Sequence, residues 1–162
     1  MKGVVALLAV AAAAAVPSLV VQSLLPPTFT GTVLLGVLAW PFVASRSLYD
    51  HVAAVAVPLG NRDLSTARSA VAMIVGRDTS KLDEAGVARA AIESLAENAS
   101  DGIVAPIFWG VLLGLPGIAG YKAINTLDSM IGHRTPRHEA FGWASARVDD
   151  VANFVPARFT AL

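Results

Sequence analysis

Three carboxylates recur at intervals of four residues in the segment AIESLAENASDG, residues 91–102, and this spacing could serve chemistry. Glu93, Glu97 and Asp101 would share one stripe of a helix, because four residues make about one helical turn. Like charges at this spacing weaken a helix by a few tenths of a kcal/mol per pair. A bound cation would turn this repulsion into coordination.

The oxygen donors near the stripe predict a magnesium site that also holds phosphate. Asn98 and Asn125 add neutral oxygen donors, and Asp128, Asp149 and Asp150 supply further carboxylates. Mg²⁺ takes one or two carboxylates and completes its shell with water and phosphate oxygens. The alternative is a solvated helix face with incidental charges. The chain has no cysteine, which excludes thiolate catalysis and cysteine-ligated metals.

Basic side chains offer partners for phosphate. Arg134 and Arg137 follow His133 in a loop that contains glycine and proline, and arginine forks match phosphate oxygens. Arg77 either pairs with Asp78 or contacts phosphate. A further polar group at helical spacing comprises Asp149, Asp150 and Asn153.

The composition is that of a membrane protein. Of 162 residues, 55% are hydrophobic and only 15% are charged, against roughly 25% in soluble domains. The formal net charge is zero, which argues against a nucleic-acid partner. The sequence contains no phosphate-loop, dinucleotide-binding, HExxH or GxSxG motif.

Two uncharged runs at the N-terminus predict a transmembrane hairpin. Gly3 to Leu25 is long enough to cross a bilayer, and Phe29 to Ala44 follows a turn at Pro26-Pro27. A signal peptide is the alternative for the first run. Lys2 and the charges from Arg46 onward then share one side, which the positive-inside rule makes cytoplasmic. We expect a multi-pass protein of the inner membrane with cytoplasmic charged loops.

The elements that must position the polar residues are predicted to be helices throughout. Arg46 to Leu59 should continue the second helix, and Asp63 should cap the next one. Ser80 with Asp83 resembles a capping box for a helix over 82–98. Its apolar face should comprise Val87, Ala91, Ile92 and Leu95.

Glycines and prolines interrupt the third uncharged run, residues 103–121, so we expect a broken or re-entrant segment there in preference to a straight span. The predicted fold is therefore an all-α, polytopic membrane protein with amphipathic cytoplasmic helices. Its expected parts are a hairpin (1–44), amphipathic polar helices (45–102), the broken segment (103–121), a polar loop and helix (122–150) and the start of a truncated apolar helix (151–162).

Several blocks of sequence resemble the CobD/CbiB family of cobalamin biosynthesis. The blocks are MIVGRDT, ESLAENASDGIVAPIFWG, YKAINTLDSMIGHRTPRHEAFGWASARVDD and ANFVPARFTAL, and the similarity runs from about Leu48 to the end. Family members are integral membrane proteins known as adenosylcobinamide (phosphate) synthases. They begin with a GDP…HP pattern that this chain lacks and continue further, so we expect a fragment of about half the usual length.

The resemblance implies an ATP-dependent acid–amine ligase that uses Mg²⁺. Its substrates would be adenosylcobyric acid and aminopropanol or its O-phosphate. Glu97, Asp101 and His133 are then the candidate catalytic residues. The expected metal ligands are Glu93, Glu97 and Asp101, assisted by Asn98 and Asp128. The candidates for binding substrate or phosphate are Arg77, Asn125, Arg134 and Arg137. The expected surroundings are the lipid bilayer and, as open alternatives, a second copy of the chain or other cobalamin-biosynthesis enzymes.

Two other classes of protein remain open at this point. One is a membrane Mg²⁺-dependent transferase of prenyl or phosphate groups, since Asn125 to Ser129, NTLDS, loosely resembles such motifs. The other is a non-catalytic membrane subunit of a corrinoid-handling complex. The sequence leaves undecided the amine, the fate of ATP and the oligomeric state.

Overall fold

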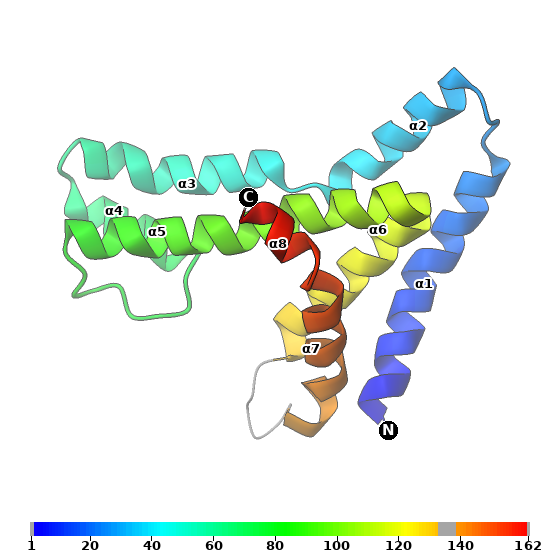
Figure 1. Ribbon diagram of the computed structural model, residues 1–162. Helices are drawn as coiled ribbons and strands as arrows, with labels where there is room; N and C mark the ends of the chain where they lie inside the picture. Colours follow the sequence, from blue (N-terminus) through cyan, green and yellow to red (C-terminus); the bar gives the residue numbers. More distant parts are fainter. Residues whose placement is uncertain (1, 133–138, 162) are drawn as a thin grey trace. The chain divides into compact units, whose positions relative to one another are not determined.

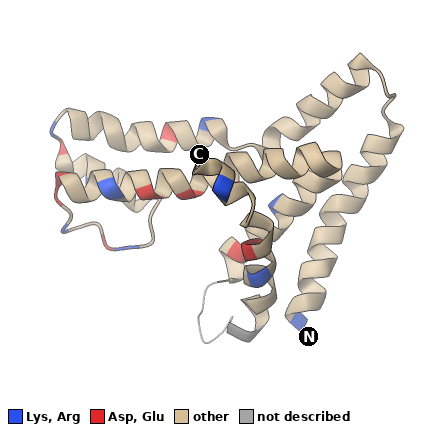
Figure 2. Cartoon of the chain, viewed as in Figure 1, with Lys and Arg blue, Asp and Glu red and all other residues tan. Residues whose placement is uncertain are grey.

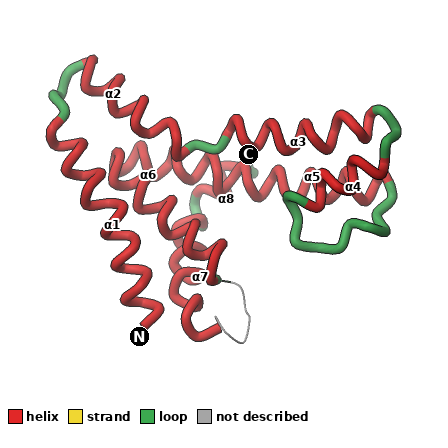
Figure 3. Tube along the Cα trace, turned by 180° about the vertical axis from the view of Figure 1, so that it is seen from behind, coloured by secondary structure: helices red, strands yellow, loops and turns green. Residues whose placement is uncertain are grey.

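The computed structural model describes residues 2–132 and 139–161, and in these residues all regular structure is helical (Figures 1 and 3). This agrees with the predicted all-α fold. The chain divides into two compact units, which are described separately. Unit 1 comprises Met1–Val43 and Asp101–Leu162, and unit 2 comprises Ala44–Ser100.

Unit 1 begins with the two apolar helices α1 (Lys2–Leu24) and α2 (Phe29–Ala39). The turn between them contains Pro26 and Pro27, as predicted, and Thr28 caps α2 by accepting a hydrogen bond from the Gly31 N–H at 3.4 Å. Among the described residues, three stretches are long and apolar enough to cross a membrane: Lys2–Leu24, Phe29–Gly60 and Glu84–Ile131.

The second apolar helix stops earlier than the sequence suggested. After α2, a 3₁₀ turn η1 (Trp40–Phe42) interrupts the chain, and Val43 adopts an extended conformation before the next helix begins. The expectation that Arg46 to Leu59 continues the second helix is therefore wrong. Pro41 provides the physical reason, since its ring and missing N–H disfavour an unbroken helix.

Helix α6 (Ala105–Ile131) follows the π-helical turn η2 (Ser100–Val104), and its two arms run in different directions (Figure 1). The arms meet at Gly114, where the backbone is not helical. Gly114 has φ 70° and ψ −151°, a conformation for which glycine is the natural residue. The two arms lie against each other, because a Cβ on Gly110 would touch Ile118 at 3.7 Å. A Cβ on Gly117 would overlap the Trp109 carbonyl. The expected break within 103–121 is therefore present, in the form of a helical hairpin.

A side chain from α1 stabilises this reversal. The Gln22 Oε1 accepts a hydrogen bond from the Leu115 N–H at 2.7 Å, at the start of the second arm. The first N–H groups of a helix lack partners within the helix, so an acceptor from another element satisfies one of them.

The rest of unit 1 packs around the α6 hairpin. Helix α7 (Glu139–Asn153) contacts both α6 and α1, and the short α8 (Pro156–Thr160) follows it. The buried cluster comprises Ala105, Tyr121 and Ala152 with Trp109 against it. The Trp109 Nε1–H donates to the Ala152 carbonyl at 3.1 Å, which joins the first arm of α6 to the end of α7.

Unit 2 is formed by α3 (Ser45–Gly60), α4 (Leu64–Ala72) and α5 (Glu84–Ala99). Asp63 caps α4 as predicted, because its carboxylate accepts from the Thr66 N–H at 3.0 Å. Asp83, not Ser80, caps α5, and it accepts from the Gly86 N–H at 2.7 Å. The buried core comprises Val55, Ala67, Val71, Val87, Ala90 and Ala91.

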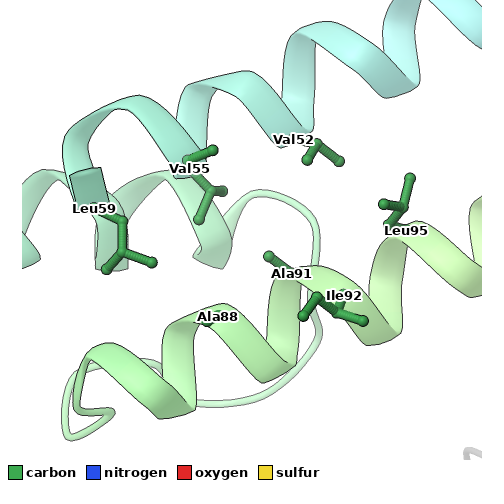
Figure 4. Close-up of a pocket in the computed structure, with 8 residues that line it drawn as sticks. Val52, Val55, Leu59, Ala88, Ala91, Ile92 and Leu95 are labelled. Atoms are coloured by element: carbon green, nitrogen blue, oxygen red, sulfur yellow. The ribbon is translucent and has the colours of Figure 1, made fainter.

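The predicted apolar face of α5 is only half correct. Val87 and Ala91 are buried, but Ile92 is 65% exposed and Leu95 is 37% exposed. Small residues carry the buried face, which also includes Gly86, Ala90 and Ser94. Ile92 and Leu95 instead line an apolar groove of about 160 Å³ between α3 and α5 (Figure 4).

Charged side chains are almost absent from α1, α2 and the first arm of α6 (Figure 2). Helix α1 carries only Lys2, α2 carries no charge, and α6 carries none before Lys122. Most charges lie on α3, α4, α5 and α7 and in the loops of unit 2.

Candidate functional site

A polar pocket of about 330 Å³ lies within unit 2, between the segment after α4 and one face of α5. Its lining residues are Ile74, Val75, Gly76, Arg77, Glu93, Ser94 and Glu97. Three candidates from the sequence therefore come together: Arg77 for phosphate, and Glu93 and Glu97 for metal.

Arg77 and Glu93 form an ion pair at this pocket through the Nη2 and Oε2 atoms. Their side chains are 50% and 67% exposed, so water screens the pair. The expected alternative of an Arg77–Asp78 pair is not what the structure shows. The Asp78 Oδ1 accepts from the Ser80 N–H at 2.9 Å, and this hydrogen bond lowers the pKa of Asp78.

Hydrogen bonds to α4 hold the loop that carries Arg77. The Arg68 Nε–H donates to the Leu82 carbonyl at 2.6 Å, and the buried Thr79 hydroxyl donates to the Arg68 carbonyl at 3.2 Å. The loop is therefore anchored to the helix before it, which places the Arg77 guanidinium over α5.

Ser94 and Asn98 order the floor of the pocket. The Ser94 hydroxyl donates to the Ile74 carbonyl at 3.0 Å. The Asn98 Nδ2 donates to the Ser94 carbonyl at 2.8 Å and to its Oγ at 3.2 Å. These contacts turn the amide nitrogen of Asn98 toward Ser94, so its Oδ1 remains an acceptor for other groups.

The donors of the pocket suit magnesium shared with phosphate. Glu93 and Glu97 supply two carboxylates one turn apart, which is the number that Mg²⁺ usually takes when phosphate and water complete its shell. Within residues 2–132 and 139–161, no group of three or more His, Cys, Asp or Glu side chains could hold a metal by protein ligands alone.

The predicted set of five metal ligands is divided between the two units. Glu93, Glu97 and Asn98 belong to unit 2, whereas Asp101 and Asp128 belong to unit 1 and are half-buried there. The set as a whole stays a prediction. His133, Arg134 and Arg137 lie outside the described residues.

A second polar site lies within unit 1, between the second arm of α6 and α7. The Asp149 carboxylate accepts from the Asn125 Nδ2 at 3.4 Å and from the Asn153 Nδ2 at 3.0 Å. The Tyr121 hydroxyl makes contacts of 2.9 Å with the Asn153 Oδ1 and 3.2 Å with the Asp101 carbonyl. The site therefore joins Asn125, a predicted substrate-binding residue, to the main chain of Asp101.

Burial dominates the electrostatics of this second site. Asp149 is 8% exposed, and burial raises the pKa of its carboxyl group. The hydrogen bond from Asn153 opposes that rise in pKa, whereas the nearby charges of Asp128 and Asp150 add to it. The site is therefore negative and poorly solvated.

Tyr121 is the residue of this site that sequence reasoning missed. The spacing of the residues could have indicated it. Tyr121 and Asn125 are four residues apart on one helix, and Asp149 and Asn153 are four residues apart on the next. Residues at this interval share a helical face, so two such faces can meet.

Helices with the length and composition of membrane spans, together with two polar sites, define the class as a helical membrane protein with carboxylate-lined sites. The family model described as CobD/Cbib protein matches residues 1–162. The chain belongs to this family.

Curated relatives agree with this assignment. The "Cobalamin biosynthesis protein CobD" of Rhodobacter capsulatus is 66% identical over 162 residues, which are 100% of this chain and 52% of that protein. Its namesake in Brucella suis biovar 1 is 55% identical over 145 residues, or 89% of this chain and 44% of that protein. The chain spans about half the length of these relatives. No solved structure matches the chain.

Proposed function

We propose that this chain takes part in forming adenosylcobinamide or its phosphate in cobalamin biosynthesis. The reaction joins the free carboxylate of adenosylcobyric acid to 1-aminopropan-2-ol or its O-phosphate through an amide bond. The observation that carries the proposal is the family match over residues 1–162, together with relatives named for cobalamin biosynthesis.

The pocket in unit 2 has groups that suit the activation of a carboxylate by ATP. Arg77 offers a planar guanidinium, which can bind two phosphate oxygens at once. A phosphate that replaces Glu93 as the partner of Arg77 would release the Glu93 carboxylate. Glu93 and Glu97 would then hold Mg²⁺, which when bound neutralises charge on phosphate oxygens.

The surroundings of the reaction belong to the same proposal. The apolar helices would lie in the inner membrane, with the charged segments on the cytoplasmic side where ATP is found. The corrinoid and the amine are the small-molecule partners. Asp101, Asp128, His133, Arg134 and Arg137 keep their predicted roles as candidates in metal binding, proton transfer and phosphate binding.

A chimera tests the proposal directly. Residues 1–162 replace the matching segment of the Rhodobacter capsulatus relative, and the chimera is expressed in a strain that grows on cobinamide but not on cobyric acid. We expect growth on cobyric acid with the unaltered chimera. Growth should fail with Arg77→Ala or Glu97→Gln.

Matched controls lie on the same helix. Arg89→Ala and Glu84→Gln change exposed α5 residues that do not line the pocket, and both should leave growth unchanged. A chimera that reaches the membrane and does not restore growth would contradict the proposed function. Growth with both pocket variants, at equal expression, would support a non-catalytic subunit instead.

A further inference from the structure

Asp149 is a buried carboxylate that the pocket in unit 2 does not explain. It lies in unit 1, it is 8% exposed, and both of its oxygens accept hydrogen bonds from amide groups. The ion pairs among the described residues join Arg46 to Asp50, Arg77 to Glu93, and Arg147 to Asp150. None of them includes Asp149, so this charge has no cationic partner in the part of the chain that the structure describes.

Neutral donors compensate such a charge only in part. Burying a carboxylate is unfavourable unless it is both hydrogen-bonded and paired with an opposite charge. Besides burial, the charges of Asp128 and Asp150 raise the pKa of the Asp149 carboxyl group, although Asp150 is itself paired with Arg147. The site therefore favours a ligand that brings positive charge.

An acceptor beside Asp149 also lacks a partner. The Nδ2 of Asn125 donates to Asp149. The Oδ1 of the same side-chain amide makes no hydrogen bond with the described residues. Asn125 is only 9% exposed, so water has little access to this acceptor. A free acceptor next to a buried carboxylate suits a small donor.

These features distinguish an ammonium group from a metal ion. A primary ammonium has three donors on one compact charge, and two acceptors side by side can take two of them. Mg²⁺ demands near-octahedral oxygen ligands, whereas each Asp149 oxygen already accepts an amide N–H.

We propose that Asp149 and the Oδ1 of Asn125 bind the primary ammonium group of the amine substrate. This inference rests on the proposed function, because that reaction supplies an amine as its second substrate. Asn153 and Tyr121 then act as positioning residues: Asn153 holds the Asp149 carboxylate, and Tyr121 contacts the Asn153 amide oxygen.

Binding to the purified chimera tests this inference without using activity. Calorimetric titration with 1-aminopropan-2-ol should show binding, whereas propane-1,2-diol, which lacks the amine, should not bind. Asp149→Asn should weaken binding of the amine by about tenfold or more, since a charge-assisted hydrogen bond is lost. The matched control is Asp150→Asn, at a neighbouring carboxylate that is 72% exposed, and it should change binding less than about twofold.

Further measurements keep the test decisive. Circular dichroism establishes that Asp149→Asn is folded, and Asp149→Glu should restore part of the binding because it keeps the charge. In the amide-forming assay, Asp149→Asn should raise the KM for the amine and leave the KM for the corrinoid unchanged. Equal binding by wild type and folded Asp149→Asn, or equal binding of amine and diol, overturns the inference.

The two proposals fail in different ways. If the unaltered chimera does not restore growth on cobyric acid, the proposed function fails. If it restores growth and Asp149→Asn alters neither amine binding nor the KM for the amine, only the ammonium site fails.

Discussion

Glu93 in unit 2 and Asp149 in unit 1 hold a negative charge in contrasting ways. The Glu93 side chain is 67% exposed and pairs with a cation, Arg77. Asp149 is 8% exposed and relies on neutral amides. Water can replace the partner of Glu93 at little cost in free energy, but it cannot easily replace the partners of Asp149. The first arrangement is therefore suited to exchanging ligands, and the second to holding the same partners in place.

The largest effect on stability is expected from Asp149→Leu. This change leaves the amide groups of Asn125 and Asn153 without their acceptor, and each buried unpaired donor costs on the order of 1–3 kcal/mol. Relief from burying a charge offsets part of this, so we expect the free energy of unfolding in detergent to fall by about 2 kcal/mol. Asp150→Leu should change it by less than about 0.5 kcal/mol. Equal losses of unfolding free energy in Asp149→Leu and Asp150→Leu would contradict the special role assigned to the buried carboxylate.

A smaller effect is expected from Tyr121→Phe. The hydroxyl group contacts the Asn153 Oδ1 and the Asp101 carbonyl, and a net hydrogen bond contributes about 1 kcal/mol. The free energy of unfolding should fall by about that amount. Tyr49→Phe is the matched control, because Tyr49 is 68% exposed, and it should have almost no effect.

The pH dependence of stability should have opposite signs at a buried and an exposed aspartate. Burial raises the pKa of Asp149 above its ordinary value of 3.8, so the folded state favours the protonated acid. Its contribution to stability is fully present below that ordinary value and is lost as the pH rises through the raised pKa. The stability of wild type relative to Asp149→Asn should therefore fall as the pH rises from about 4.

Asp63 supplies the opposite case. Hydrogen bonds from Thr66 lower the pKa of Asp63, so its contribution is present above the ordinary value and is lost as the pH falls through the lowered pKa. The stability of wild type relative to Asp63→Asn should fall as the medium becomes more acidic. Thermal unfolding in detergent at several pH values measures both differences, and slopes of the same sign would contradict the assignment.

The smallest effect on stability is expected from Arg77→Ala. Exposed ion pairs contribute about 0–1 kcal/mol, so the change in unfolding free energy should resemble that of Arg46→Ala, which removes another exposed pair. Growth on cobyric acid should nevertheless be lost with Arg77→Ala alone. A loss of stability above about 2 kcal/mol would assign Arg77 a structural role.

Local signals in the sequence were sufficient for much of the fold. Uncharged runs gave the helices α1 and α2, paired prolines gave the turn between them, and Asp63 marked the start of α4. The cap of α5 was placed three residues early, because Ser80 and Asp83 are both good capping residues. Only tertiary packing decides between two such candidates.

The candidate sites were harder to predict, because they depend on contacts between residues far apart in the sequence. The spacing of Glu93 and Glu97 identified one wall of the pocket, but the ion pair of Glu93 with Arg77, rather than Asp78 with Arg77, follows from the folding of the loop onto α4. Similarly, the intervals within α6 and α7 did not reveal that their polar faces meet at Asp149. The exposure of Ile92 was missed because small residues, not large ones, form the buried face of α5.

The reversal at Gly114 also bears on the order in which the chain assembles. Gln22 and Leu115 are 93 positions apart, and the glutamine is synthesised first. A ribosome-bound chain would thus have the acceptor for the reversal available on its N-terminal helix before the Gly114 bend emerges. A side chain at the bend is disfavoured, because Gly114 has φ 70° and a Cβ there would displace the Gln22 amide.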